Sequence, residues 1–184
     1  MLFIGDVHGK YDEYLKIIAN ASESIQVGDM GFDYAPLVNV SENHRFIKGN
    51  HDNYREDHSL DLGAWGVYQG IGFLRGAKSV DIYQRVEGRN YFPEEELTYS
   101  TLQLAVLRLT QIQPRIMVSH DLPQSLATSF FGITDRTTTR NALEALWQDC
   151  KPNLWVFGHH HRSVDYIIEG TRFVGLNELE TFQF

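Results

Sequence analysis

Short apolar runs recur along the chain, and each one closes on glycine or on polar turn residues. LFI near the N-terminus leads into Gly5, and LWVF leads into Gly158. Runs of this length that are bounded by turn residues are typical of buried β-strands. We therefore expect strands over residues 1–5, 24–27, 45–48, 115–119 and 154–157.

Between these runs, apolar residues recur with helical spacing. Tyr14, Leu15 and Ile18 fall on one face of a helix over 11–21. Pro93 precedes three glutamates, which favours a helix start because acidic residues stabilise the positive end of the helix dipole. The pattern predicts helices over 11–21, 94–109 and 138–150, hairpin or meander strands over 66–86 and 163–175, and irregular segments at 52–66 and 121–137.

The alternation of strands and helices predicts an α/β fold, and the length of 184 residues predicts one domain over residues 1–184. A chain of this size can bury roughly 70% of the surface of its unfolded state, so it can form a core without disulfides. Cys150 is the single cysteine, which excludes an intramolecular disulfide and a cysteine-built zinc site. It also fits a reducing compartment.

The net charge and the N-terminal sequence argue against some classes of binding partner and cellular location. The formal net charge of −8 argues against general binding to duplex nucleic acid, which favours basic surfaces. The start MLFIGDVHGK lacks the basic and long apolar regions of a signal peptide, and no segment has the roughly 18 apolar residues of a membrane span. We expect a cytoplasmic protein without membrane contact; the sequence leaves its oligomeric state open.

Polar residues that can bind metals follow each of the five predicted strands. In open α/β sheets, ligands bind beyond the carboxyl ends of the strands. If the strands are largely parallel neighbours, all five segments meet at one edge. The segments are GDVHG (5–9), GDMG (28–31), GNHD (49–52), SHD (119–121) and GHHH (158–161).

The residue types in these segments suit divalent metals such as Mn, Fe, Co, Ni or Zn. Two such ions about 3.5–4 Å apart can share a carboxylate and a hydroxide and clamp both oxygens of an in-line displacement at phosphorus. In an extended segment, residues i and i+2 project to the same side, which pairs Asp6 with His8 and His159 with His161 and turns His160 away. The alternative for each segment alone is an ordinary turn or a solvated loop.

In order, these five segments resemble the calcineurin-like metallophosphoesterase superfamily, whose pattern is D-x-H, G-D, G-N-H-[DE], H and G-H-x-H. The match runs from residue 6 to residue 161. The resemblance implies a sandwich of two β-sheets flanked by helices and a centre of two divalent metal ions, with Mn²⁺ the first choice and Fe, Zn, Ni or Co as alternatives.

The resemblance also implies roles for individual residues. It implies that His51 does not bind a metal but protonates the leaving oxygen or stabilises the phosphoryl group. Asp52 is then expected to orient the His51 ring. His160 fills the variable position, where a structural role is expected. The implied metal ligands are Asp6, His8 and His161 on the first ion, Asp29 bridging both ions, and Asn50, His120 and His159 on the second.

Two further features narrow the branch of the family. Protein Ser/Thr phosphatases continue the second motif as G-D-x-V-D-R-G, whereas here Asp29 is followed by Met-Gly-Phe-Asp, so their phosphate-binding arginine is missing. Segment 73–97 resembles one found in small bacterial and phage enzymes. Arg85, with Arg75 and Arg89 as alternatives, is a candidate contact for substrate phosphate, because arginine binds phosphate bidentately; the other interpretation is an exposed loop arginine.

The expected activity is therefore hydrolysis of phosphodiester or small phosphomonoester bonds by attack of a metal-bridging hydroxide. With no room for a cap domain, the site is expected to be open to a small phosphorylated substrate, a nucleotide or a nucleic-acid end. Trp65, Phe130 and Phe131 are available either for stacking on a base or for core packing. The alternatives are a protein Ser/Thr phosphatase-like enzyme and a non-catalytic metal-binding scaffold.

Overall fold

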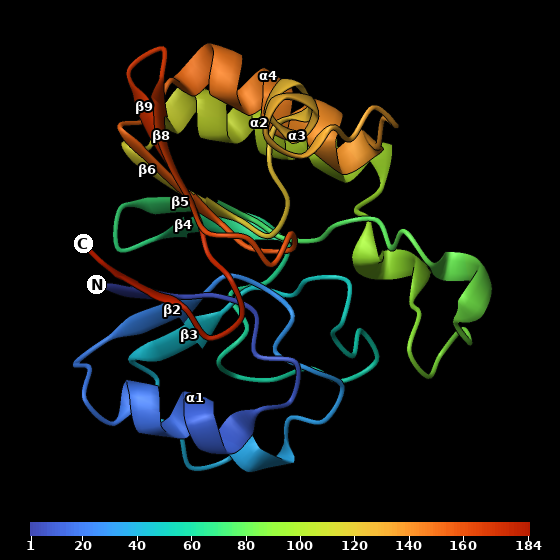
Figure 1. Cartoon of the computed structure of the whole chain (residues 1–184), viewed down its shortest axis with the longest axis vertical. Coiled ribbons are helices and arrows are strands. Elements are labelled where there is room, and N and C mark those ends of the chain that lie inside the picture. The colour runs from blue at the N-terminus through green and yellow to red at the C-terminus, as the bar shows by residue number, and fades with distance from the viewer.

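Two β-sheets pack face to face in the computed structural model, which describes residues 1–184 (Figure 1). The four-stranded sheet has the order β10-β1-β2-β3, and the six-stranded sheet has the order β4-β5-β6-β7-β9-β8. The strands are β1 (Leu2–Ile4), β2 (Ser24–Gln26), β3 (His44–Phe46), β4 (Trp65–Tyr68), β5 (Ile71–Leu74), β6 (Ile116–Ser119), β7 (Leu154–Phe157), β8 (Val164–Ile168), β9 (Thr171–Gly175) and β10 (Thr181–Gln183).

Parallel pairing gives the carboxyl ends of the central strands a common direction. β1, β2 and β3 are parallel to one another, and so are β5, β6, β7 and β9. The antiparallel strands β4, β8 and β10 lie at the sheet edges. The five strands expected from the apolar runs are all present, and the sandwich of two sheets flanked by helices is confirmed.

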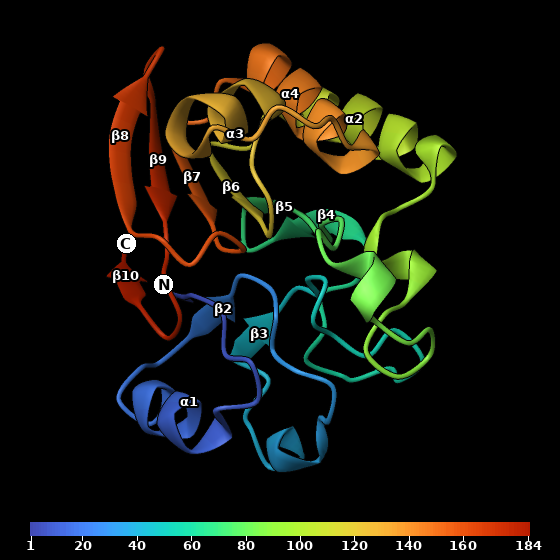
Figure 2. The ribbon, with the colours of Figure 1, turned by 45° about the vertical axis from the view of Figure 1, so that its right-hand side comes forward.

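Helices cover the outer faces of both sheets (Figure 2). Ile18 of α1 packs with Phe46 outside the four-stranded sheet, and Leu143 of α4 packs with Trp155 outside the six-stranded sheet. Between the sheets, residues such as Phe3 and Val156 form the inner core. The helices are α1 (Tyr11–Ile18), α2 (Tyr99–Ile112), α3 (Gln124–Phe131) and α4 (Thr138–Cys150). None of them is both long enough and apolar enough to span a membrane.

The helix expected over 94–109 begins later than predicted. Pro93–Glu95 forms a 3-10 turn, and α2 starts only after Thr98, whose side chain accepts the Thr101 amide as an N-cap. Glu95 accounts for the difference, since its carboxylate turns inward and accepts hydrogen bonds from the amide and hydroxyl of Ser79 at 2.6 and 2.8 Å. A buried contact thus overrides the helix-start signal at Pro93.

The segment 121–137 is not irregular throughout, because it contains α3. Leu126 and Ala127 are buried against the core, and Gly132 ends the helix with a φ of 69°. A glycine in the left-handed region is the usual end of a helix, so Gly132 was a usable signal. The short length of α3 hid its periodicity.

The hairpin predictions were right for 163–175 and only partly right for 66–86. β8 and β9 pair as an antiparallel hairpin, as β4 and β5 do, but the chain leaves the sheet after Leu74. The amide of Gly76 donates to the carbonyl of Lys48 at 2.9 Å, which draws this segment toward the loop at 49–52. β10, which pairs with β1, was not predicted.

Candidate metal centre

The five polar segments converge where the carboxyl ends of β1, β2, β3, β6 and β7 meet at one edge of the sandwich. Two overlapping groups of side chains there have ligand atoms that all lie within 4.8 Å of one another. The first group contains Asp6, His8, Asp29 and His161, and the second contains Asp29, His120 and His159.

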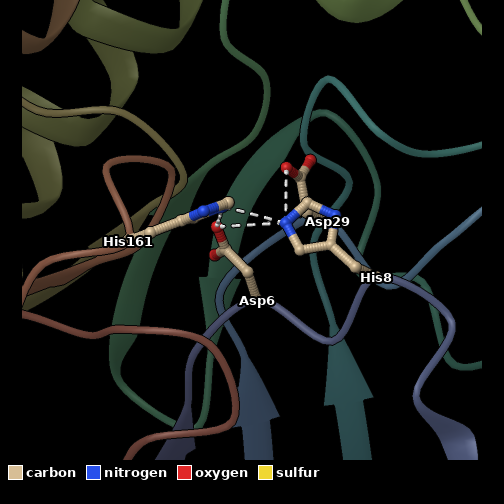
Figure 3. A group of neighbouring side chains, drawn as sticks. All are labelled: Asp6, His8, Asp29 and His161. Carbon is tan, nitrogen blue, oxygen red and sulfur yellow. Dashed lines mark hydrogen bonds and ion pairs between the residues drawn. The ribbon is translucent and has the colours of Figure 1, made fainter.

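The first group joins β1, β2 and the loop after β7 (Figure 3). Nε2 of His161 lies 3.1 Å from Oδ2 of Asp6 and 2.9 Å from Nε2 of His8. Nε2 of His8 also lies 3.8 Å from Oδ2 of Asp6 and 3.8 Å from Oδ2 of Asp29. Four side chains that can act as metal ligands thus have their ligand atoms close together.

The second group lies deeper in the sandwich. Nε2 of His120 lies 3.1 Å from Oδ1 of Asp29 and 3.2 Å from Oδ1 of Asn50. The other ring nitrogen of His120, Nδ1, donates to the carbonyl of Val27 at 3.0 Å. That hydrogen bond fixes the tautomer and leaves Nε2 free as a ligand.

The donor set fits divalent metal ions. Bonds of about 2.0–2.2 Å from a metal to nitrogen or oxygen place neighbouring ligand atoms on one ion roughly 3 Å apart. The 2.9–3.2 Å separations within both groups match this spacing. Carboxylate, amide oxygen and imidazole are the ligands expected for borderline divalent ions.

The backbone of several of these residues is left-handed. Residues His8, Asp29, His159 and His161 have φ values of 50°, 61°, 68° and 49°. Such values are uncommon outside glycine and gather at functional sites, where the surrounding structure must hold them. Asp6 and His8 lie in the same group, as the D-x-H spacing predicted, although the backbone at His8 is not extended. The pairing of His159 with His161 is wrong, because the chain turns between them and they belong to different groups.

Two glycines are required because ligand side chains lie directly on their backbone. A Cβ at Gly49 would overlap Oδ1 of Asp29 and approach Nε2 of His120 to 2.5 Å. A Cβ at Gly28, whose φ is 114°, would overlap the ring of His120. Gly28 and Gly49 thus make room for ligand side chains that come from other strands.

The charges around the site keep the Asp29 carboxylate ionised and shift the pKa values of His120 and His159 in opposite directions. Burial alone would raise the pKa of Asp29, but His120, His51 and His8 hold it well below its usual range. Burial lowers the pKa of His120, yet Asp29 and Asp6 outweigh it and raise that pKa to about 10. A metal ion at Nε2 of His120 would have to displace this proton. Burial lowers the pKa of His159 well below its usual value, which leaves its ring neutral.

Asp52 does not orient His51, so that prediction is wrong. Its fully buried carboxylate accepts hydrogen bonds from the amides of Asp29, Met30, Gly31 and Gly49 at 2.9, 3.3, 3.2 and 2.7 Å, and one from the Tyr34 hydroxyl at 3.0 Å. Asp52 therefore ties the second motif to the third through their backbones. Burial, reinforced by the negative charge of Asp29, raises the pKa of Asp52 to about 7.

Arg85 occupies the place expected for Asp52. Its Nη2 lies 2.7 Å from Nε2 of His51, while its other nitrogens donate to the carboxylate of Asp81 and to the carbonyl of Asn50. A guanidinium can only donate, so Nε2 of His51 accepts and the ring proton is on Nδ1. These protein contacts engage most of the donors that Arg85 would offer to substrate phosphate.

Two residues behind Asn50 were missed from the sequence. Nδ2 of Asn50 lies 3.4 Å from the Ser79 hydroxyl, which turns the amide oxygen toward His120. Ser79 is held by the buried carboxylate of Glu95. The signal was present in segment 73–97, where Ser79 and Glu95 are part of the resemblance, but no spacing rule connects them to Asn50.

A second buried network supports the histidine loops from the helix side. Nε of Arg140 donates to Oδ2 of Asp121 at 2.7 Å, and Oδ1 of Asp121 accepts from Nε2 of His160 at 3.1 Å. The His160 ring stacks on Phe131 with centroids 4.3 Å apart. His160 therefore points away from the first group, toward the helical layer, and Trp65 and Phe131 pack against the core of that layer.

The comparisons with known proteins agree with this geometry. A family model described as calcineurin-like phosphoesterase matches residues 1–163. The chain therefore belongs to the calcineurin-like phosphoesterase family, which confirms the resemblance found in the sequence. No curated protein matches the chain.

Solved structures with a similar fold include two bacterial proteins. Phosphopantetheinyl hydrolase from Mycobacterium tuberculosis is similar with a TM-score of 0.52 and 12% identity over 96% of this chain and 89% of that one. A protein provisionally named a 5′-nucleotidase from Staphylococcus aureus, in complex with alpha-ketoglutarate, has a TM-score of 0.55 and 14% identity over 96% of this chain. The chain spans 48% of that protein's length, and at these identities the similarity concerns the fold alone.

Proposed function

We propose that the chain is a phosphoester hydrolase that uses two divalent metal ions, with Mn²⁺ the first choice. The observation that carries this proposal is the shared carboxylate: Asp29 belongs to both groups of ligand atoms, with Oδ2 facing His8 and Oδ1 facing His120. A carboxylate whose two oxygens face two separate sets of imidazoles is the arrangement that two adjacent cations need.

Two bound divalent ions would polarise the phosphoryl oxygens and lower the pKa of a water molecule toward neutrality. The residues of the chain then have distinct tasks. Asp6 and Asp29 supply the negative charge that holds cations in a buried site. Val27 keeps His120 in the tautomer that can bind, and His51 presents its Nδ1 proton to the phosphoryl group or to the leaving oxygen.

The substrate class we propose is a phosphodiester or a small phosphomonoester, including nucleotides and nucleic-acid ends. The second motif lacks the arginine that follows the aspartate in protein phosphatases. Without that arginine, the motif offers no side chain that binds the phosphate of a phosphoprotein through two parallel hydrogen bonds, which supports a small ester over a folded phosphoprotein as substrate. The net charge of −8 favours small or terminal substrates over long duplexes.

Removal of metal is expected to abolish the activity. Protein treated with a chelator should hydrolyse neither bis-p-nitrophenyl phosphate nor p-nitrophenyl phosphate, and added Mn²⁺ should restore turnover of at least one of them. Metal loading should also raise the melting temperature, since ligands that bind only the folded state stabilise it. A phosphopeptide in the same panel tests the protein-phosphatase alternative. Metal binding without turnover of any ester would favour the scaffold alternative.

His51→Gln is expected to slow hydrolysis by about 10²- to 10⁴-fold while metal content stays unchanged. The metal frame survives because His51 contacts Asp29 through its backbone amide, at 2.7 Å from Oδ1, which glutamine retains. The loss should be largest for substrates with poor leaving groups. His58→Gln, a histidine outside both ligand groups, is the control and should retain both activity and metal content. Equal losses in the two variants would contradict the role of His51.

A further inference from the structure

A cavity of about 360 Å³ opens beside the candidate metal centre, on the side of His8 and His51. Its other walls come from Gly9, Tyr11, Gly31, Phe32 and Asp33. The volume is in the range of small-molecule sites, at its lower end. The cavity shares His8 and His51 with the proposed site. If the phosphate of a substrate binds at the metals, the group esterified to that phosphate can therefore extend into the cavity.

The lining of the cavity combines the aromatic rings of Tyr11 and Phe32 with two glycines, Gly9 and Gly31. The Phe32 ring lies 6.1 Å from the His51 ring and 6.3 Å from the Phe92 ring, so it is held among other rings. A Cβ at Gly31 would come within 3.0 Å of the Tyr11 hydroxyl and 2.9 Å of the Gly9 amide nitrogen. Flat rings find stacking partners in such a space.

Asp33 is the one carboxylate among the residues that line the cavity. Asp33 is exposed, and its Oδ1 accepts the Ala35 amide at 3.0 Å. Lys10 pairs with Glu178 and Arg85 pairs with Asp81, whereas Arg55 lies over the Phe92 ring at 5.9 Å from its centroid. Asp33 is also the residue found where the protein-phosphatase motif has its phosphate-binding arginine. Its other oxygen is free to accept a hydrogen bond from a ligand.

We propose that this cavity receives the leaving group of the substrate and selects ring-bearing alcohols that are neutral or cationic, such as nucleosides or aryl alcohols, over alcohols that carry a second anionic group. The inference rests on the proposed function and specifies its substrate class. In the reaction the bond from phosphorus to the leaving oxygen breaks, a bond to the oxygen of water forms, and a proton from that water ends on the leaving alcohol. Asp33 repels an anionic group on that alcohol and attracts a cationic one.

The test uses three aryl phosphates of similar size, each as a monoester and as a methyl diester. Their rings carry an aminomethyl cation, a neutral hydroxymethyl group or a carboxymethyl anion, in which a methylene separates the polar group from the ring so that the phenols have similar acidity. For the Mn²⁺-loaded wild-type protein, kcat/KM should be about fivefold higher for the cationic than for the anionic substrate. Asp33→Asn should remove the preference, and Asp33→Arg should invert it.

Asp149→Arg is the matched control, because it makes the same change in net charge at the exposed end of α4, away from the carboxyl ends of the strands. It should keep the wild-type preference. The same preference in Asp33→Arg as in the wild type, with all substrates turned over, would overturn this inference and leave the proposed function standing. Failure of the metal-loaded protein to hydrolyse any of the six esters would overturn both.

Discussion

Asp29→Asn is expected to lower kcat/KM by at least about a thousandfold, the equivalent of about 4 kcal/mol of transition-state stabilisation. Asparagine keeps the shape of the side chain and removes the charge. Asp29 is buried, and its two oxygens face different groups of ligands, so the loss of charge weakens both sites at once. Turnover of bis-p-nitrophenyl phosphate and the metal content per chain measure the two consequences.

Variants in each of the two ligand groups distinguish a ligand shared by both ions from a ligand of one ion. His161→Gln and His120→Gln each alter one group and should each leave about one ion per chain, whereas Asp29→Asn should leave none at the same metal concentration. Asp12→Asn, which changes an exposed carboxylate in the first turn of α1, should match the wild type in both measurements. Near-normal activity and full metal content in Asp29→Asn would rule out the proposed role.

The sequence predicted the location of the site well because the signal is repeated at successive strand ends. Polar residues such as Asp6, Asp29 and His120 each follow a buried strand, and parallel pairing then brings them together without further information. What the sequence could not show is how each side chain is held. Asp52 directly follows His51 in the third motif, but the turn of the backbone sends its carboxylate toward the amides of the second motif.

Contacts between residues far apart in the chain account for the remaining differences. Arg85 reaches His51 from 34 residues away, and Glu95 reaches Ser79 from 16 residues away. Local patterns such as a proline followed by glutamates report only what a segment prefers in isolation. At Glu95 the buried hydrogen bonds outweigh that preference, so the helix start at Pro93 was predicted where the fold forms a turn.

The interior of the six-stranded half of the molecule also depends on a charged pair. Arg140→Met is expected to lower the free energy of unfolding by about 3–5 kcal/mol, because it leaves the carboxylate of Asp121 buried without its cation. Both side chains are 1% exposed or less, and Nε of Arg140 lies 2.7 Å from Oδ2 of Asp121. Urea unfolding in the presence of a chelator measures the change without a contribution from bound metal.

Two comparisons distinguish the buried pair from ordinary packing. The double variant Arg140→Met/Asp121→Asn should recover part of the lost stability, since it removes the charge that the single variant leaves uncompensated. Arg172→Met breaks the exposed pair with Asp165, whose shortest distance is also 2.7 Å, and should cost much less because solvent screens that pair. Equal losses for Arg140→Met and Arg172→Met would show that burial of the charge is not what makes Arg140 important. Because Asp121 follows His120 and binds His160, a loss specific to Arg140→Met should also weaken metal binding by loosening both histidine loops.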